Sequence, residues 1–351
     1  MLENMTRRGG EPKTVTGELG LIQWIRARAR KGGAGPKVGA GVVLGIGDDC
    51  ALLRVRPGEE IAVTTDLSIE GRHFRMDWHE PEVVGHRTLA RGLSDLAAMG
   101  ARPVAAFVSL GLRREMASGS RDAWVKRFFG GLMKLAAEYD VPLAGGDLAE
   151  SPVVLADIVL TGAVPRGKAM RRSGARAGDA ICVTGELGGA AAGLERLAAG
   201  VSSQFAVDSE KARLGGRDLA AALRAHLYPQ PRVEQGLRLR GAATAAIDLS
   251  DGLSTDLAHV CQESELTAEV DEAALPIAPG ATLEQALHGG EDYELLFTVA
   301  AGRRIPRMIA GVRVTRIGRM LRRRARRPQV TLKSADGSVR ALEARGWEHF
   351  R

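Results

Sequence analysis

Short apolar runs alternate with longer amphipathic segments through most of this chain. In the N-terminal half, the apolar runs predict strands at residues 61–65, 104–110 and 153–164. Apolar residues at helical spacing predict helices at residues 18–30, 81–99 and 121–139. Pro81 lies in the first turn of the middle helix and Gly100 follows its end, which favours a helix with these limits. The alternation indicates an α/β (α+β) fold.

The same alternation resumes after residues 165–179, a basic, glycine-rich segment without apolar periodicity. Further strands are expected at residues 180–184, 245–247, 293–299, 312–318 and 328–333. Further helices are expected at residues 188–199, 231–240, from 252 onward and near 302–310. Both halves contain a strand, an acid-rich turn and a helix, so we expect two similar domains. We divide the chain into a flexible N-terminal tail, an N-terminal domain and a C-terminal domain at residues 1–16, 17–164 and 165–351.

The composition is that of a soluble globular protein of two domains. The chain has 351 residues, of which 45% are hydrophobic and 26% charged, which argues against disorder as its main state. No apolar stretch is long enough to span a bilayer, and the polar N-terminus does not resemble a secretory signal. The three cysteines, Cys50, Cys182 and Cys261, are too far apart for a disulfide framework or a zinc site. We therefore expect a cytoplasmic protein in a reducing environment.

The net charge is +7, and part of this excess lies in one arginine-rich run. The run contains Arg319, Arg322, Arg323, Arg324, Arg326 and Arg327, with no acidic residue among them. Such a run can bind nucleic acid or another anionic partner. It has no interleaved aromatic residues and no nucleic-acid reading motif. We therefore favour a solvated loop between two strands.

Aspartates gather at turns beside glycine or serine, mostly after apolar runs. They are Asp48, Asp49, Asp66, Asp95, Asp147, Asp248 and Asp251. Each alone has a structural explanation, as a turn residue, a helix cap or, for Asp95, an ion pair with Arg91. Together they suggest carboxylates that meet in a cleft and need a counter-charge. Hard oxygen ligands suit Mg²⁺ with phosphate groups, so the pattern predicts a magnesium–nucleotide site.

Other nucleotide-binding and catalytic motifs are incomplete or absent. Residues 162–168 match the GxxxxGK pattern of a P-loop, but Ala169 replaces the hydroxyl residue that would bind Mg²⁺. Glycines follow where a P-loop would continue as a long helix. The sequence also lacks GxSxG and HExxH motifs and an evident nucleophile–base pair.

The acidic motifs occur in a recognisable order. The chain contains, in sequence, GIGDDCALL, TTDLSIEGRHF, LSDLAAMGARP, AGGDLAESP, AMRRSGARAGD, IDLSDGLSTDL, HGGEDYELLFT and GWEHF. From about Glu18 to its C-terminus it closely resembles the thiamine-monophosphate kinase family of the aminoimidazole-ribonucleotide-synthetase-like superfamily. The tail and the arginine-rich insert at 319–327 depart from the family pattern without touching a motif.

The resemblance implies an activity and an assembly. The enzyme would transfer the γ-phosphoryl group of ATP to the phosphate of thiamine monophosphate, with the help of several Mg²⁺ ions. Its products would be thiamine diphosphate and ADP. The implied fold has two α/β domains, and the N-terminal domains of two chains pair into a homodimer across a shared β-barrel.

The resemblance also assigns roles to residues by motif position. The implied metal ligands are Asp49, Thr64, Thr65, Asp66, Asp95, Asp147, Asp248 and Asp251. The implied ATP contacts are Gly146, Asp147, Arg172 and Ser250. The implied thiamine contacts are His73, Glu291 and Trp347. No acid–base catalyst is required, because the acceptor phosphate is already ionised at neutral pH.

Two alternatives remain open on the sequence. A sister ATP-dependent synthetase with another small-molecule substrate would share the acidic motifs. A nucleic-acid binder acting through the arginine-rich run would leave those motifs unexplained.

Overall fold

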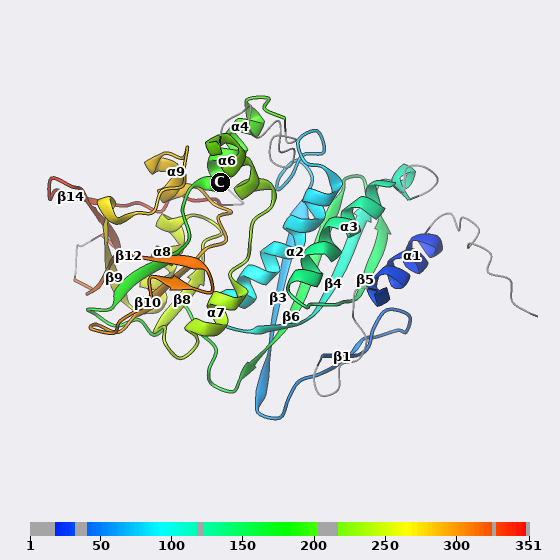
Figure 1. Cartoon of the computed structure of the whole chain (residues 1–351), viewed down its shortest axis with the longest axis horizontal. Coiled ribbons are helices and arrows are strands. Elements are labelled where there is room, and N and C mark those ends of the chain that lie inside the picture. The colour runs from blue at the N-terminus through cyan, green and yellow to red at the C-terminus, as the bar shows by residue number, and fades with distance from the viewer. Residues whose placement is uncertain (1–17, 32–40, 118–122, 203–216, 325–327, 349–351) are drawn as a thin grey trace, which may run out of the picture.

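The computed structural model describes residues 18–31, 41–117, 123–202, 217–324 and 328–348. Two β-sheets stand side by side in it, each with helices packed against it (Figure 1). One sheet is built from residues before 166, and the other from residues after 179. The predicted tail, residues 1–16, lies outside the described residues.

The first sheet has four long strands and two covering helices. The strands are β3 (Glu59–Ile69), β4 (Arg102–Leu112), β5 (Leu143–Glu150) and β6 (Leu155–Pro165). The helices are α2 (Pro81–Ala98) and α3 (Ala123–Glu138). The strand order is β3–β6–β4–β5, with β4 and β5 parallel and the other neighbours antiparallel. One chain therefore forms an open sheet here, with β3 and β5 at its edges.

The helix-covered face of this sheet carries a continuous core. Leu89 and Leu93 of α2, Phe128 of α3 and Leu160 of β6 are fully buried in it. Helices α2 and α3 lie very close together, because a Cβ at Gly85 would stand only 1.9 Å from the Phe128 carbonyl oxygen. Helix α2 also contacts the C-terminal half of the chain, so this core extends between the two sheets.

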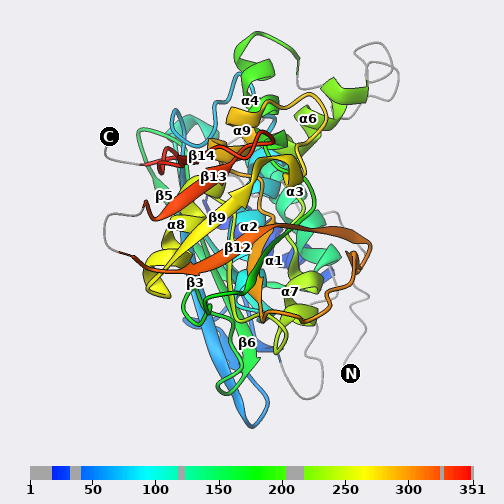
Figure 2. The ribbon, with the colours of Figure 1, turned by 90° about the vertical axis from the view of Figure 1, so that its left-hand side faces the viewer.

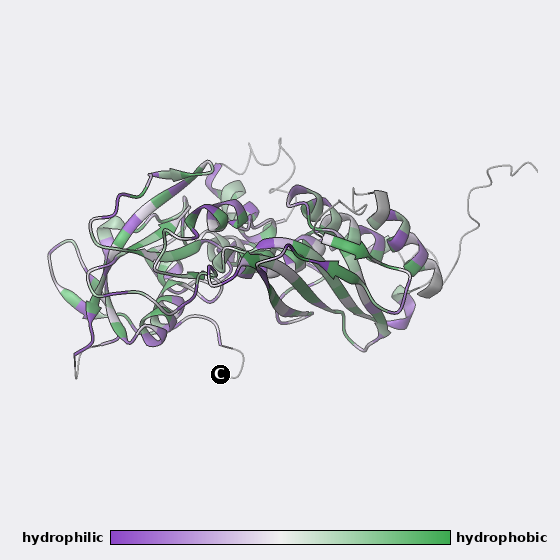
Figure 3. Cartoon of the chain, turned by 90° about the horizontal axis from the view of Figure 1, so that it is seen from below, coloured by the Kyte–Doolittle hydropathy of each residue, from purple (hydrophilic) through white to green (hydrophobic). Residues whose placement is uncertain are grey.

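The opposite face of the same sheet is only partly covered. A hairpin of β1 (Gly41–Leu44) and β2 (Leu52–Arg54) packs Val42 and Leu53 over Val104 and nearby small residues. Helix α1 (Glu18–Lys31) lies near the edge strand β5, and its Leu21 and Ile25 belong to the core of the helix-covered face instead. Figure 3 shows that hydrophobic segments run through the strands of this lobe.

The second sheet is larger and mostly antiparallel. Its strands are β7 (Ala180–Thr184), β8 (Ala245–Asp248), β9 (Leu266–Asp271), β10 (Leu295–Val299), β11 (Met308–Ile309), β12 (Val312–Arg322), β13 (Val330–Lys333) and β14 (Val339–Ala341). The order is β14–β13–β9–β12–β7–β10–β8, with β11 beside β12, and Figure 2 shows β13, β9 and β12 in succession. Its helices are α4 (Gly189–Ala198), α6 (Arg217–Leu227), α7 (Val233–Leu239), α8 (Leu253–Glu263) and α9 (Leu283–His288).

The predicted helix near 302–310 is wrong. That segment is irregular and ends in the short strand β11. Pro306 explains the difference, because proline lacks the N–H that a helix interior needs and disfavours helical backbone in the residue before it.

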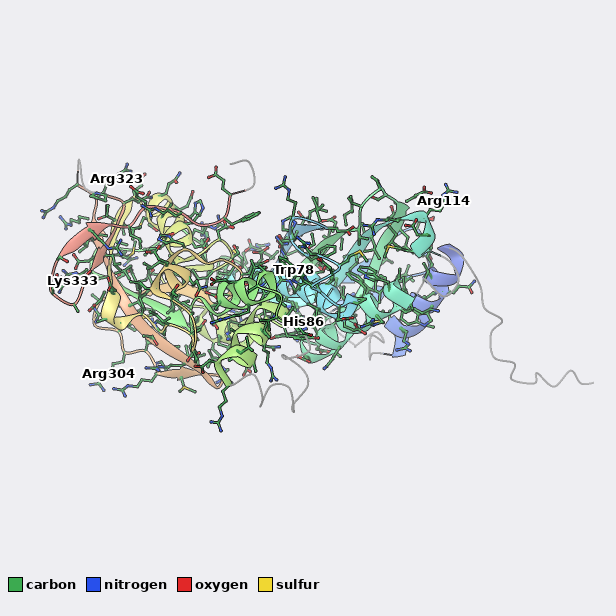
Figure 4. The ribbon with its side chains drawn as sticks, turned by 90° about the horizontal axis from the view of Figure 1, so that it is seen from above. Trp78, His86, Arg114, Arg304, Arg323 and Lys333 are labelled. Atoms are coloured by element: carbon green, nitrogen blue, oxygen red, sulfur yellow. The ribbon has the colours of Figure 1, made fainter. Side chains whose placement is uncertain are left out.

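The arginine-rich run begins within a strand, whereas a loop was predicted for it. Strand β12 continues to Arg322, and the Arg319 guanidinium lies 2.8 Å from Glu269 of β9. Arg323 lies near the end of the C-terminal lobe, well away from Trp78 between the lobes (Figure 4). Arg326 and Arg327 fall outside the described residues.

Candidate functional site

A cavity of about 530 Å³ lies where α2 and β3 meet the loops of the second sheet. The N-terminal half contributes β3, the loop of residues 71–79 and one stripe of α2. The C-terminal half contributes the start of α4, the turn after β8, the loop before β10 and Trp347. Trp78, which lines the cavity, lies between the two lobes in Figure 4. The cavity therefore exists only because the two halves pack together.

Four of the predicted aspartates line one side of this cavity. They are Asp66 of β3, Asp95 of α2, and Asp248 and Asp251 at the end of β8. The Thr64 hydroxyl donates a hydrogen bond to Asp95, and the Ser94 hydroxyl donates one of 2.7 Å to Asp248. The alternation of β3 turns Thr64 and Asp66 toward α2, where Asp95 faces them. Carboxylates distant in sequence thus converge as the acidic pattern predicts.

The electrostatics of this acidic side favour a bound cation. Burial raises the pKa of Asp95 to about 6, and the negative charge of Asp66 adds to that rise. Burial raises the pKa of Asp248 to about 7, with a further contribution from Asp95. The positive charge of Arg172 opposes both shifts, which places this predicted ATP contact beside the cluster. Crowded, partly buried carboxylates repel each other and gain stability when a cation joins them.

The donor set suits Mg²⁺, since every candidate ligand offers oxygen. Within the described part of the chain, however, no three histidine, cysteine or acidic side chains are grouped closely enough to hold a metal on their own. Mg²⁺ commonly binds through one or two carboxylates and completes its shell with water and phosphate oxygens. The arrangement therefore fits a metal that arrives with a phosphate ligand.

The other side of the cavity is built around Glu291. Its carboxylate Oε1 lies 2.6 Å from the Arg87 guanidinium, and its Oε2 lies 3.5 Å from Nδ1 of His226. Burial alone would raise the pKa of Glu291, but the positive charge and the hydrogen bond of Arg87 lower it to about 2. Glu291 also has a positive φ of 66°, and its N–H donates to the Ser250 carbonyl over 2.8 Å. A permanently ionised carboxylate is thus fixed at the cavity wall.

Aromatic and imidazole groups surround this carboxylate. Trp347 is 50% exposed and lines the cavity, and its backbone N–H donates a hydrogen bond of 3.1 Å to the carbonyl of Asp251. His73 lines it as well, and its Nδ1 accepts from the Ile69 N–H at 3.0 Å. The arrangement suits a flat, positively charged organic group.

Six predicted site residues do not line this cavity. Thr64 and Arg172 lie next to its acidic side, as described above, and the other four lie farther away. Thr65 alternates with Thr64 on β3, so it faces the other side of the sheet and is exposed. Asp147 of β5 is paired through β4 and β6 with Leu67 of β3. Residues paired in this way have their side chains on the same face of the sheet. Asp147 therefore lies on the same exposed face as Leu67 and Thr65. Gly146 lies beside it with a φ of 146°, and a Cβ there would stand 1.9 Å from the Val108 carbonyl oxygen. Asp49 is exposed in the turn after β1.

Several residues in or next to the cavity are not predicted from the sequence. Arg87 and Arg91 lie on one stripe of α2 with Asp95, at a spacing of four residues, and this spacing was a usable signal. Arg91 pairs with Asp66 at 3.4 Å, where the sequence suggested a pair with Asp95. His79 and His226 meet across 147 residues, and nothing in the local sequence indicates that contact.

Comparison with known proteins agrees with the architecture. The family model described as "AIR synthase related protein, N-terminal domain" matches residues 47–165, and the corresponding C-terminal domain model matches residues 176–330. The thiamine-monophosphate kinase of Escherichia coli K12 is 39% identical over 321 residues, which cover 88% of this chain and 92% of that protein.

Two solved structures are similar over nearly the whole chain. The thiamine-monophosphate kinase of Stenotrophomonas maltophilia K279a has a TM-score of 0.76 and 37% identity, and the match covers 91% of this chain and 96% of that one. AaThiL complexed with AMPPCP and TMP has a TM-score of 0.72 and 28% identity, with 95% and 97% covered. The predicted two-domain α/β architecture is confirmed, and the chain belongs to the thiamine-monophosphate kinase family.

Proposed function

We propose that this protein transfers the γ-phosphoryl group of ATP to thiamine monophosphate, which yields thiamine diphosphate and ADP. One observation carries the proposal: the carboxylate cluster and the Glu291–Trp347 wall belong to the same cavity of about 530 Å³. The first suits metal-bound phosphates and the second suits a flat organic cation. The names of its relatives, and the relative complexed with AMPPCP and TMP, support the same reaction.

We propose that Thr64, Asp66, Asp95, Asp248 and Asp251 hold the Mg²⁺ ions. When bound, Mg²⁺ neutralises charge on the phosphate oxygens of both substrates and so lets the two anions approach. Asp49, Thr65 and Asp147 stay predicted ligands. They do not line the cavity, and variants of these residues would test whether they bind Mg²⁺.

The remaining chemistry needs positioning rather than acid–base catalysis. We assign Arg172 to the ATP phosphates, since a guanidinium donates a planar pair of hydrogen bonds to such oxygens. Ser250 lines the cavity beside Asp251 and is assigned to ATP as well. Gly146 and Asp147 stay predicted ATP contacts. The acceptor oxygen is ionised at neutral pH, so the transfer can proceed in line without a general base.

The thiamine part of the substrate would occupy the other wall. Glu291 keeps its negative charge near neutral pH, because its pKa is lowered to about 2. That charge complements the positive thiazolium ring of thiamine monophosphate. Trp347 can stack on the same ring by cation–π attraction, and His73 closes the wall beside it.

We also propose a homodimer formed through the uncovered face of the four-stranded sheet. Ile61 and Val63 of edge strand β3 are 55% and 61% exposed, and Leu67 is exposed on the same side. Exposed apolar residues in a row on a sheet edge favour association. Two such sheets, face to face, would form the expected shared β-barrel.

The division into domains at residues 17–164 and 165–351, and a cytoplasmic location, remain parts of this proposal. Cys50, Cys182 and Cys261 form no disulfide with each other, which suits a reducing compartment. No helix among the described residues has both the length and the apolarity needed to cross a membrane.

The direct test is release of ADP from ATP by the purified chain. We expect release only when Mg²⁺ and thiamine monophosphate are both present, with thiamine diphosphate as the second product. ADP release that ignores thiamine monophosphate and requires another small acceptor would instead support a sister synthetase.

A further inference from the structure

Behind Glu291, buried polar side chains form a continuous array from α2 to the end of α6. His79 and His226 are only 3% and 1% exposed, and their Nε2 atoms lie 3.0 Å apart. Arg87 donates to the His226 carbonyl and to Glu291 Oε1. His226 Nδ1, on the far side of the ring, lies 3.5 Å from Glu291 Oε2 and 3.5 Å from Nη1 of Arg87, whose hydrogen bond goes to the His226 carbonyl. His79 and His226 line the same cavity, and the three side chains connect Glu291 to the contact between α2 and α6.

The close approach of the two imidazoles restricts their protons. Burial and the nearby Arg87 charge lower the pKa of His79 to about 4, and they lower that of His226 well below its usual value. Both rings are therefore neutral at physiological pH, and each carries one N–H. A 3.0 Å contact between two Nε2 atoms requires one donor and one acceptor, so the rings hold opposite tautomers.

The surroundings of His79 decide which tautomer each ring has. The Arg75 carbonyl already accepts from the N–H groups of Trp78 and His79, at 3.1 and 2.8 Å. His79 Nδ1 lies 3.2 Å from the Arg75 N–H, for which it can be the acceptor, and 3.1 Å from the Arg75 carbonyl oxygen. A proton on His79 Nδ1 would remove that acceptor and add a third donor to the carbonyl. His79 therefore carries its proton on Nε2 and donates it to His226 Nε2, so the His226 proton lies on Nδ1.

We propose that Arg87 and His226 are positioning residues that orient the Glu291 carboxylate toward the thiamine part of the substrate, and that His79 sets the tautomer of His226 required for this. The inference rests on the proposed function. Arg87 fixes Oε1, and the His226 Nδ1–H approaches Oε2. The Glu291 backbone is held at a positive φ. With one donor at each carboxylate oxygen, the Glu291 side chain is restricted to a single orientation.

The unsubstituted protein provides the first test. Long-range ¹H–¹⁵N correlation spectra of the histidine side chains distinguish the two neutral tautomers. We expect the Nδ1–H form for His226 and the Nε2–H form for His79 at neutral pH, with assignment by loss of each signal in a single variant. An Nε2–H tautomer or a charged ring at His226 would overturn the proposal.

A matched pair of variants tests the consequence for the substrate. In His226→Asn, the amide nitrogen stands where Nδ1 was and keeps a donor toward Glu291. In His226→Gln, the amide nitrogen stands where Nε2 was, so a donor faces His79 and the donor toward Glu291 is lost. Because His226→Gln removes the donor that faces the charged carboxylate, we expect it to raise the KM for thiamine monophosphate about tenfold. The KM for ATP should change little in either variant.

We expect His226→Asn to keep a KM for thiamine monophosphate close to that of the parent. Equal effects of the two variants, or equal rises in the KM of both substrates, would contradict a positioning role. A parent protein that does not phosphorylate thiamine monophosphate would contradict the proposed function and this role together. The tautomer spectra distinguish that result from failure of the hydrogen-bond chain, because they need no substrate.

Discussion

The two faces of the four-stranded sheet differ in nearly every respect that matters for function. On the helix-covered face, Thr64 donates a hydrogen bond to Asp95 of α2, and Asp66 and Asp95 line the cavity. On the other face, Val63 and Thr65 of the same strand are exposed. The strand period of two divides one motif, TTD, between these environments. Neighbouring residues in a motif therefore need not have their side chains in one site.

This contrast suggests separate roles for the faces. The covered face gathers carboxylates whose pKa values are raised, so it can bind cations. The uncovered face carries apolar residues along an edge strand, so it can bind another chain. Asp147 and Thr65, although predicted as metal ligands, lie on the second face.

The largest expected effect is that of Asp95→Asn on the covered face. Loss of a carboxylate from the metal cluster should lower kcat by about a thousandfold, which corresponds to roughly 4 kcal/mol in the transition state. The melting temperature should stay the same or rise, because a neutral amide avoids the burial of charge. ADP release and thermal unfolding measure the two effects. Turnover near that of the parent would remove Asp95 from the catalytic cluster.

A pair of threonine variants compares the faces directly. Thr64→Val removes the hydroxyl that donates to Asp95, and we expect kcat/KM to fall about tenfold to a hundredfold. Thr65→Val is the matched control on the other face, and its kcat/KM should fall less than about threefold. Steady-state kinetics with saturating Mg²⁺ measure both. An equal loss at Thr65 would show that the site continues across the sheet and would restore its predicted role as a ligand.

The uncovered face can be tested through its state of assembly. Val63→Asp places a charge on an exposed apolar strand, so it should convert a dimer into monomers at micromolar concentration. Sedimentation velocity measures this change, and Val63→Thr is the matched control with a similar shape. A parent protein that is monomeric would reject the dimer. An unchanged dimer in Val63→Asp would move the interface elsewhere.

The last effect, which concerns stability rather than activity or assembly, is that of His86, which lies on α2 away from the cavity. Its Nε2 contacts the Pro229 carbonyl at 2.8 Å, and burial lowers its pKa to about 4 from the usual 6.5. Between these pH values the unfolded chain binds the proton more readily, so acidification destabilises the fold, by at most about 3 kcal/mol. This contribution is complete above pH 6.5 and is lost as the pH falls toward 4.

His86→Gln should therefore lose less stability than the parent over this pH range, as measured by urea unfolding at several pH values. Comparison with the parent is needed because Asp95 and Asp248, whose pKa values are raised, have the opposite pH dependence in both proteins. Parallel curves for the two proteins would show that His86 does not titrate in this way.

Much of the fold could be predicted because local periodicity is strong where one side of an element is buried. Helix α2 begins at Pro81 as expected, and β7 agrees with the apolar run at 180–184. Strand β5, with the sequence LAGGDLAE, was not predicted, because two glycines and two acids hide a strand that forms by pairing with β4. Near Pro306 apolar residues suggested a helix, although the proline prevents one.

The site was predictable as a set of motifs but not as a geometry. Asp66, Asp95, Asp248 and Asp251 converge as expected, yet the sequence does not state which face of a strand a residue takes when both faces carry polar groups. The histidine pair behind Glu291 depends on a contact between distant helices and loops. Local spacing cannot encode such a contact.

The central claim is that one cavity binds metal-bound phosphates at its acidic side and thiamine at its Glu291 side. A crystal structure with Mn²⁺ in place of Mg²⁺, a non-hydrolysable ATP analogue and thiamine monophosphate tests it most directly, since Mn²⁺ is located by anomalous scattering. We predict metal peaks bound to Asp66, Asp95, Asp248 and Asp251 between the two phosphate groups, with the thiamine ring beside Glu291 and Trp347. Metals bound elsewhere, with these four carboxylates free of them, would contradict the account.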